Sequence, residues 1–257
     1  MLINLLLEKK FIPLKIDQCL NSIMMRYISI KTTENLLNVS KKSICCIGAV
    51  IKGGTGFLVK LSIASEKNVL FGLMTNNHVI NADYIKCNEN FKIYFNSEDS
   101  KDQHPYTISI DENNFIFTSE LIDITFIQLH DEFVKNPEFD FLDLYCDECN
   151  KQDEIYIFQY PKGKLSFAKG KIEFSFGFNY FHVVSTDEGS SGSPLLNETM
   201  KVVGVHKGRI KTGKINVDTK ISIVKYAINT YIIKVILMIL KKQEKPLESY
   251  QIKKKKN

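Results

Sequence analysis

The sequence predicts an all-β protein, an antiparallel barrel or sandwich organised as two strand-rich lobes. Between residues 43 and 129, short runs rich in Ile, Val and Phe alternate with polar or proline-containing segments, and a second set of such runs occupies residues 154–218. Short strands at this spacing are typical of antiparallel barrels and sandwiches. The acidic, polar stretch 136–152 separates the two sets and indicates a linker between lobes.

The expected strands follow from these apolar runs, taken in order. In the first lobe they are Ser43–Lys52, Phe57–Leu61, Val69–Met74, Phe91–Phe95, Tyr106–Ile110, Asn114–Phe117 and Ile124–Leu129. In the second lobe they are Glu154–Gln159, Lys164–Ala168, Lys171–Phe176, Tyr180–Ser185, Lys201–His206 and Ile215–Asp218. The glycine-rich segment 53–56 is expected to be a turn, because glycine is the residue that turns favour most.

The two ends of the chain differ in character from these lobes. Residues 1–40 are expected to be an N-terminal extension with a helix at Ile16–Ile30, followed by a first lobe at 41–140 and a second at 141–222. Residues 223–257 are expected to be a helix and a basic tail, since Ile221–Leu240 is densely apolar without the two-residue alternation of a strand. Pro246 is predicted to end that helix, and the lysine tail to be disordered.

Composition narrows the class of protein. The chain has 257 residues, 44% of them apolar, which is enough for a sizeable core. Its net charge is +5, but the final lysines Lys253–Lys256 supply four of these charges, so the near-neutral body argues against a nucleic-acid-binding face. We expect no membrane span, because Lys225 and Lys234 interrupt the best candidate, Ile221–Leu240. We also expect a monomer.

The N-terminus and the cysteines bear on localisation and on metal or redox chemistry. Met1–Leu7 is apolar but lacks a basic segment, and charges interrupt it early, so a secretory signal is not expected. The six cysteines fit no secreted disulfide scaffold, and both points favour the cytoplasm. Cys146-x-x-Cys149 resembles half a zinc site or a redox pair, but no second such pair completes it. We therefore expect reduced, packed thiols and no metal or cofactor.

One short stretch stands out as a candidate for chemistry. Gly189-Ser190-Ser191-Gly192-Ser193-Pro194 places serines between glycines. Such a backbone can aim consecutive N–H groups at one point, where a developing oxyanion would be stabilised. Ser191 would then be a nucleophile, with the N–H groups of Gly189 and Ser191 as donors. A Ser/Gly surface turn explains this stretch equally well, because a serine is a weak nucleophile unless a base activates it.

A base and an acid are available elsewhere in the chain. His78 follows the apolar run ending at Met74, at a strand end where a scaffold can position a catalytic side chain. Asp123 lies within an apolar run, where a carboxylate needs a hydrogen-bonding partner such as a histidine N–H. A strand-edge aspartate facing water is the alternative. The order is His, Asp, Ser, with the first two in the first lobe and the serine in the second.

At this point the sequence resembles the trypsin/chymotrypsin-fold serine proteases over roughly residues 43–225. The residues that carry the resemblance are Gly54-Thr55-Gly56-Phe57-Leu58, Thr75-Asn76-Asn77-His78-Val79, Asp123-Ile124 and Gly189-Ser190-Ser191-Gly192-Ser193-Pro194. It implies two packed six-stranded antiparallel β-barrels with a catalytic triad at their junction. It also implies that His78 is the general base and then acid, that Asp123 orients it, and that Ser191 is the nucleophile. No cofactor is implied.

The sequence is similar in further detail to bacterial glutamyl endopeptidases. The similarity lies in Tyr160-Pro161, Lys169-Gly170-Lys171-Ile172, Ser185-Thr186 and Val203-Gly204-Val205-His206. In those enzymes a threonine five residues before the nucleophile and a histidine on the following strand line a pocket for an acidic side chain, and Thr186 and His206 match them. A hydroxyl and an imidazole can both donate to a carboxylate. His206 as a pocket wall without selectivity is the alternative.

The resemblance also implies how substrate binds, and the sequence departs from the family in places. The backbone of His206, Lys207 and Gly208 is expected to pair with an extended polypeptide substrate as an added strand. Ser190 stands where trypsin-like digestive enzymes have an aspartate that receives the freed N-terminus, so that activation route is not expected. Ser185 stands where trypsin has its basic-selecting aspartate, which argues against cleavage after Lys or Arg.

The leading hypothesis is a serine endopeptidase that works through an acyl-enzyme, possessing a preference for an acidic residue before the cut. A catalytically inactive, peptide-binding module on the same scaffold is the alternative, because a fold does not fix a function.

Overall fold

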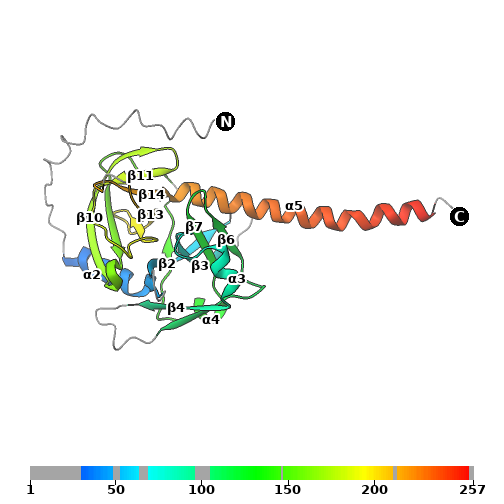
Figure 1. The fold of residues 1–257 in the computed structure, drawn as a ribbon, viewed down its shortest axis with the longest axis horizontal. Coiled ribbons are helices and arrows are strands. Elements are labelled where there is room, and N and C mark those ends of the chain that lie inside the picture. Colours follow the sequence, from blue (N-terminus) through cyan, green and yellow to red (C-terminus); the bar gives the residue numbers. More distant parts are fainter. Residues whose placement is uncertain are drawn as a thin grey trace. The chain divides into compact units, whose positions relative to one another are not determined.

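The computed structural model describes residues 30–48, 53–63, 69–95, 105–145, 147–210 and 213–254. The chain divides into two compact units, Met1–Asn35 and Leu36–Asn257, and all the described strands belong to the second unit. In that unit the strands form two mainly antiparallel sheets, and helix α5 (Ile221–Lys254) follows the last strand (Figure 1). Except for its last residue, the helix expected at Ile16–Ile30 lies outside the described residues.

The first sheet has eight strands in the order β5-β4-β1-β2-β3-β7-β6, with β8 pairing in parallel with β2. Its strands are β1 (Ile44–Ile47), β2 (Gly54–Ser62), β3 (Val69–Thr75), β4 (Asn90–Phe95), β5 (Tyr106–Ser109), β6 (Ile116–Ser119), β7 (Ile124–Gln128) and β8 (Leu142–Asp143). Three helices accompany it: α2 (Ile30–Ser43), α3 (Ala82–Cys87) and α4 (Asp131–Val134). Within the described residues this sheet is a half-barrel and does not close.

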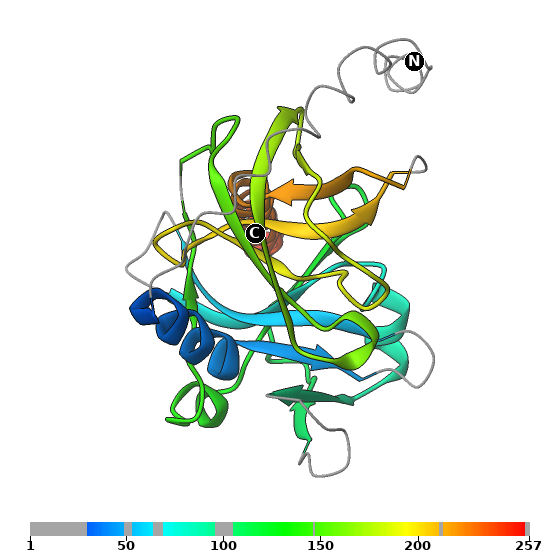
Figure 2. The ribbon, with the colours of Figure 1, turned by 90° about the vertical axis from the view of Figure 1, so that its left-hand side faces the viewer.

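The second sheet is a closed barrel of six strands in the order β10-β11-β14-β13-β12-β9. Its strands are β9 (Glu154–Gln159), β10 (Ser166–Phe176), β11 (Asn179–His182), β12 (Pro194–Leu196), β13 (Val202–Arg209) and β14 (Asn216–Lys220), with a short 3-10 helix η2 (Pro161–Gly163) after β9. Figure 2 looks along α5, and the strands of both sheets are seen beside it. The predicted all-β fold is confirmed, and the second sheet is a closed six-stranded barrel as expected, whereas the first, expected to be a six-stranded barrel, is an eight-stranded half-barrel within the described residues.

Each sheet encloses its own apolar core, because alternate side chains of a strand point to opposite faces. In β4, for example, Phe91 and Ile93 are buried while Lys92 is exposed. The first core gathers Leu58, Leu73, Ile93, Ile108 and Ile127. The second gathers Ile155, Ile157, Ile172, Leu195 and Val203.

Two glycine-based expectations are wrong for the same reason. Gly54 and Gly56 lie inside β2 and not in a turn, and Gly170 lies inside β10, which is one continuous strand where two were expected. A Cβ on Gly54 would lie 2.7 Å from Val79 Cγ1, and one on Gly170 would lie 2.3 Å from Val184 Cγ2. Each glycine lets a valine from another segment of the same chain pack closely against the strand. The sequence alone does not distinguish a glycine in this role from a glycine in a turn.

The linker and the C-terminal helix also differ from expectation. The stretch 136–152 contains β8, and Leu144 forms a bridge with Val202 of the second barrel, so it takes part in the sheets. Helix α5 continues through Pro246 to Lys254, where the sequence predicted an end at the proline and a disordered tail. A proline removes one backbone N–H, and the carbonyl that it leaves unpaired can be hydrated at a helix surface.

Thr55 on β2 joins the first sheet to the second barrel. Its side chain is fully buried, its hydroxyl donates to the Gly189 carbonyl at 2.8 Å, and the same oxygen accepts from the Tyr160 N–H at 2.9 Å. Its own N–H donates to the Ser191 carbonyl at 2.8 Å, and its carbonyl accepts from the Thr75 hydroxyl at 2.8 Å. One residue therefore satisfies polar groups on three segments that lie far apart in sequence.

Replacing Thr55 by valine is expected to lower the free energy of unfolding by about 2–4 kcal/mol, because a buried N–H and a buried C=O lose their partner while the shape is kept. Thr107→Val, on an exposed position of β5, is the matched control and should change stability by less than about 0.5 kcal/mol. Chemical denaturation measures both. Equal stabilities for the two variants would contradict the role given to Thr55.

Candidate active site

His78 and Asp123 are brought together at the end of β3, as the sequence predicted. The His78 ring nitrogen Nδ1 lies 2.8 Å from Asp123 Oδ2, and the His78 backbone N–H donates to Asp123 Oδ1 at 3.0 Å. The carboxylate thus holds the residue through both its ring and its backbone. The Asp123 side chain is 20% exposed and that of His78 is 48% exposed, so the imidazole faces solvent while the acid lies behind it.

Local structure and the second barrel both position Asp123. The residue has a φ of 55°, a left-handed conformation that aspartate tolerates better than most residues. The Asn76 side-chain amide donates to the Asp123 carbonyl at 2.9 Å, which ties the turn to the end of β3. The Thr219 hydroxyl of β14 donates to the Ile122 carbonyl at 2.7 Å, so the second barrel supports the same turn.

The serine loop has a tightly hydrogen-bonded shape. Gly189 and Gly192 have φ angles of 95° and 87°, and a Cβ on either would lie 2.4 Å or less from a backbone carbonyl oxygen. The buried Ser190 hydroxyl accepts from the Asp187 N–H at 3.0 Å, and the Ser193 hydroxyl donates to the Ser190 carbonyl at 2.6 Å. Both glycines are therefore required by the backbone, and the serines on either side of Ser191 close the loop.

Ser191 lies at the tip of this loop beside β13. Its hydroxyl donates to the Lys207 carbonyl at 3.3 Å, and within the described residues it makes no hydrogen bond to the His78 ring. The backbone N–H groups of Gly189 and Ser191 donate to no described residue. These two N–H groups of the serine loop therefore remain free for a ligand.

The serine loop packs directly against the segment that carries His78. A Cβ on Gly192 would lie 2.3 Å from Thr75 Oγ1 and 3.3 Å from the backbone nitrogen of Asn76, two residues before His78. The structure therefore brings all three predicted catalytic residues to the junction of the two sheets. It joins the His–Asp pair by hydrogen bonds and leaves the serine hydroxyl on a different acceptor.

Thr186, one of the predicted pocket residues, is held inside a polar cluster. Its hydroxyl donates to Asn216 Oδ1 at 2.7 Å, and only 6% of the residue is exposed. The Arg209 guanidinium donates to the Thr186 carbonyl and lies 3.4 Å from the Thr186 hydroxyl oxygen, and its Nε donates to Asn216 Oδ1 at 3.4 Å. The hydroxyl proton of Thr186 is thus already used, and the cation beside it is Arg209.

His206, the other predicted pocket residue, belongs to a buried charged cluster. Its Nδ1 lies 2.9 Å from Asp218 Oδ1, and the Nε2 of His182 lies 3.1 Å from Asp218 Oδ2. The His182 Nδ1 accepts from the Val184 N–H at 3.0 Å, so the His182 proton sits on Nε2 and points to the carboxylate. The Nε2 of His206 makes no hydrogen bond to a described residue. Asp218 therefore fixes the orientation of both rings.

Asp218 is fully buried, and its pKa reflects two opposing effects. Burial alone raises the pKa, but the charges and hydrogen bonds of His182 and His206 outweigh it, so that the pKa lies below its ordinary value. The three side chains also offer ligand atoms within 4.8 Å of one another, an arrangement that can hold a metal ion. The N–H donors that already face the carboxylate favour a hydrogen-bonded cluster.

The predicted substrate strand, His206–Lys207–Gly208, lies on β13. Strand β12 pairs with β13 only as far as Val205, whereas β14 continues to pair with it up to Arg209. Past His206, the β12 side of β13 therefore has no neighbouring strand within the described residues. The Lys207 side chain is half-buried, and burial lowers its pKa despite the opposing charges of Asp123 and Asp218.

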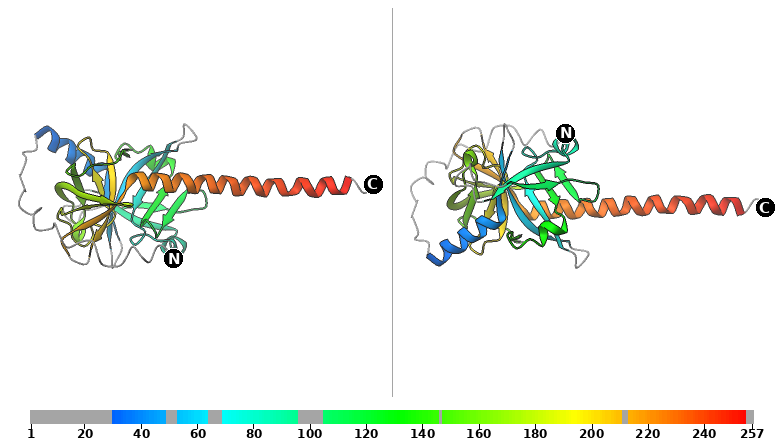
Figure 3. Two further views of the ribbon diagram at one scale, coloured as in Figure 1. Left: turned by 90° about the horizontal axis from the view of Figure 1, so that it is seen from above. Right: turned by 90° about the horizontal axis from the view of Figure 1, so that it is seen from below.

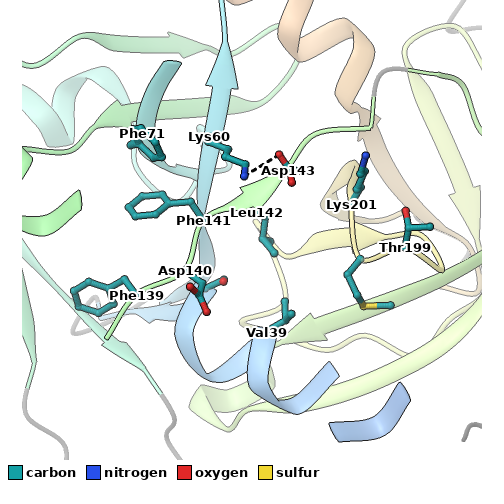
Figure 4. Close-up of a pocket in the computed structure, with 12 residues that line it drawn as sticks. Val39, Lys60, Phe71, Phe139, Asp140, Phe141, Leu142, Asp143, Thr199 and Lys201 are labelled. Atoms are coloured by element: carbon teal, nitrogen blue, oxygen red, sulfur yellow. Dashed lines mark ion pairs between the residues drawn. The ribbon is translucent and has the colours of Figure 1, made fainter. Parts of the chain in front are cut away.

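A separate hollow of about 440 Å³ lies away from these residues (Figure 4). Its lining comes from α2, β2, β3, the β8 segment and the turn before β13, and Lys60 and Asp143 form an ion pair of 3.2 Å on its wall. None of the predicted site residues lines it. This hollow therefore does not mark the candidate active site.

The four cysteines within the described residues, Cys45, Cys46, Cys87 and Cys149, are free thiols. Cys19 and Cys146 lie outside the described residues, and so does any pairing of Cys146 with Cys149. Burial raises the pKa of Cys46 and of Cys149 to about 11. These thiols remain protonated near neutral pH, as expected for packed cysteines.

A half-barrel and a closed barrel with a His–Asp pair and a serine loop at their junction define the class of trypsin-like serine peptidases. The model of the trypsin-like peptidase domain matches residues 54–205, more than half of the chain, and the chain belongs to this family. It is thus a serine-type peptidase, and the predicted resemblance is confirmed. Among curated proteins, none matches the chain.

Solved structures of several proteases share the fold. A Glu endopeptidase in complex with MPD is 18% identical with a TM-score of 0.56, over 76% of this chain and 92% of that one. The serine endoprotease from Yersinia pestis is 13% identical with a TM-score of 0.57, over 79% and 67%. The active form of the Rv3671c protease from M. tuberculosis is 14% identical with a TM-score of 0.54, over 77% and 89%.

Sequence reasoning missed four residues that shape the site. Thr55 looked like part of a turn, and nothing in its local sequence points to the second barrel. Arg209, Asn216 and Asp218 are brought to Thr186 and His206 by the pairing of β13 with β14. The register places Asp218 opposite His206 and Asn216 opposite Arg209.

Asp218→Asn is expected to lower the free energy of unfolding at pH 7 by about 2–4 kcal/mol, because a neutral amide accepts from the two buried rings more weakly than a charged carboxylate, and its NH2 group can face the His182 Nε2–H. Because the folded-state pKa is depressed, this stabilisation is present above about pH 4 and is lost as the pH falls through the folded-state pKa. The difference in the free energy of unfolding between variant and wild type should therefore become smaller as the pH falls below about 4. Asp143→Asn, at an exposed ion pair, is the control and should show neither effect; a constant gap for Asp218→Asn would contradict the assignment.

Proposed function

We propose that this peptidase hydrolyses peptide bonds through an acyl-enzyme on Ser191, with His78 as the proton carrier and Asp123 as its orienting acid. The observation that carries the proposal is the two-point hold of Asp123 on His78, beside a serine loop with two free N–H donors. An acid that binds the Nδ1–H of a histidine leaves Nε2 as the base.

The steps follow from these positions. The Ser191 oxygen attacks the scissile carbonyl, and its proton passes to His78 Nε2. The carbonyl oxygen becomes an oxyanion between the N–H groups of Gly189 and Ser191. Collapse breaks the C–N bond, the leaving amine takes the proton from His78, and an ester to Ser191 remains. Water then attacks the ester with His78 as base, which releases the acid and restores the serine.

The Ser191–Lys207 hydrogen bond indicates that the substrate itself helps to release the Ser191 hydroxyl before the first reaction step. The Lys207 carbonyl lies at the open edge of β13, where an extended peptide would donate an N–H to it. A bound substrate would compete with the Ser191 hydroxyl for this carbonyl and free the hydroxyl for His78. Catalytic hydrogen bonds commonly tighten only in the substrate complex, so the unliganded arrangement is compatible with activity.

The same hydrogen bond is also the observation that favours the second candidate, an inactive peptide-binding module. In that case the hydroxyl would keep its bond to Lys207 and peptides would dock on β13 without being cut. A fluorophosphonate probe separates the two candidates, since it labels only a serine that a base has activated.

Ser191→Ala is expected to reduce kcat/KM for peptide hydrolysis by at least about 10⁴-fold and to abolish fluorophosphonate labelling, with unchanged thermal stability. Ser109→Ala, an exposed serine of β5, is the control and should behave like wild type. A rate for Ser191→Ala within about tenfold of wild type would exclude Ser191 as the nucleophile. Peptide binding by wild-type protein without cleavage or labelling would support the inactive module.

We also infer a preference for an acidic residue before the cut, with Arg209 supplying the positive charge. Thr186 and His206 are the residues that the sequence proposed for this pocket. Thr186 already donates to Asn216, so its hydroxyl has no second proton to offer a carboxylate. The Arg209 guanidinium donates to the Thr186 carbonyl, and Arg209 lies two rungs along the β13–β14 ladder from His206. An incoming carboxylate can take over these donors and form a charge-assisted pair.

His206 and Asp218 complete this pocket. The His206 Nε2 has no described partner, whereas its Nδ1–H is held by Asp218. A substrate carboxylate could accept a hydrogen bond from His206 Nε2 if that nitrogen were protonated. The buried Asp218 carboxylate would then balance the positive charge of the His206 ring.

Two matched peptides with Glu or Gln before the cut measure the preference. Wild type is expected to favour Glu in kcat/KM by roughly 10- to 100-fold, the value of a charge-assisted hydrogen bond. Arg209→Gln should remove most of this ratio while cleavage of the Gln peptide stays nearly unchanged. Lys214→Gln makes the same change of charge at an exposed site on the β13–β14 hairpin and should keep the ratio. A preference for Lys, Arg or Phe in wild type would contradict acidic specificity, and an unchanged ratio in Arg209→Gln would contradict the role of Arg209.

A further inference from the structure

Helix α5 changes abruptly from a packed helix to an exposed one. Its first turns bury Ile221, Val224 and Ile228, which are 2%, 0% and 0% exposed, against the strands. The Tyr231 ring then lies 6.1 Å from Phe115 and 5.7 Å from Phe117, measured between ring centres. In both views of Figure 3 the C-terminal part of the helix runs past the strands. Only about the first third of the helix therefore packs against the strands of the two sheets.

The next turns carry large apolar side chains on every side. Those that are 46–61% exposed are Ile233, Ile236, Leu237, Met238, Ile239 and Leu240. Five consecutive exposed apolar residues, 236–240, go round more than one full turn of a helix, since a turn takes 3.6 residues. A partner helix covers one stripe of its neighbour and leaves the rest in water. An apolar surface on all sides instead requires surroundings that are apolar on all sides.

This segment is not the core helix of a soluble domain. Ile221–Leu240 has a mean hydropathy of 1.8, sufficient in length and composition to cross a membrane, yet only 11% of that window is buried. The interior of the protein therefore does not explain its composition, and lipid, unlike a single partner helix, can surround a helix on all sides.

The charge that follows the apolar segment points to the kind of lipid. Residues 241–257 contain seven lysines and two glutamates, an excess of five that equals the net charge of the whole chain. Lysines beside an apolar helix favour a membrane surface that carries anionic headgroups, and each contributes about 1 kcal/mol near such a surface.

We propose that α5 beyond Tyr231 inserts into one leaflet of an anionic bilayer and so holds the peptidase at a membrane surface. The nine residues Ile232–Leu240 measure about 13.5 Å at 1.5 Å per residue, less than half of a hydrocarbon core of about 30 Å. While the first turns stay packed on the strands, the helix is too short to cross. It enters at a shallow angle, and the lysines reach the headgroups from its end. The expectation that no segment spans a membrane is compatible with this arrangement and stays a prediction.

Flotation of the full-length protein with vesicles tests the proposal. Vesicles of phosphatidylcholine with about one third phosphatidylserine should bind it, binding should weaken as salt rises, and vesicles of phosphatidylcholine alone should bind at least about tenfold less. Ile236→Glu with Ile239→Glu should reduce binding to the anionic vesicles by about tenfold or more, because charges in the leaflet are costly. Both residues are exposed, so the thermal transition should not change.

Thr107→Glu with Ser109→Glu is the matched control, because it adds the same two charges at exposed positions of β5. This control should bind the vesicles like wild type. Equal binding by the helix variant and the control would overturn the proposal, as would equal binding to both kinds of vesicle. Sedimentation without lipid tests whether a second copy of the chain covers the exposed turns instead. A wild-type dimer that the helix variant abolishes would assign these turns to a second copy and overturn the membrane assignment.

Discussion

The arrangement of the site depends on a buried hydroxyl. Thr55 lies on a strand of the first sheet, yet its polar atoms serve Gly189, Tyr160 and Ser191 of the second barrel. Two barrels that met only through apolar contacts could slide, because the hydrophobic effect has little directional preference. Hydrogen bonds of fixed length do not permit such sliding. The relative position of His78 and Ser191, which come from different sheets, is thereby set by one short strand segment.

The second barrel applies the same principle to the specificity region. Asp218, His182 and Asn216 are almost completely buried, and such groups are costly unless paired. Each is paired, and the pairs run from strand to strand around Thr186 and His206. Partly buried polar groups that are locked by their neighbours lose little entropy when a ligand arrives. The network therefore supplies stability and orientation together, and Arg209 at its exposed end is the member that can respond to a ligand's charge.

Local chemistry explains which parts of this structure the sequence could predict. Apolar runs identified most strands, and His78, Asp123 and Ser191 could be proposed for the site because each lies in a local setting that suits the proposed role. The features that could not be predicted depend on the pairing of segments that are distant in sequence. Gly54 and Gly170 were misjudged because the atoms that exclude a side chain there belong to Val79 and Val184. Asp218 and Arg209 were missed because the register of β14 on β13, and not their own neighbours in sequence, gives them their partners.

The bond between the Ser190 hydroxyl and the Asp187 N–H has a consequence for how such an enzyme can be controlled. The loop around Ser191 closes on a hydroxyl that the loop itself contains, so this bond forms when the chain folds and involves no newly exposed amine. The folded shape of this loop therefore does not depend on prior cleavage of the chain.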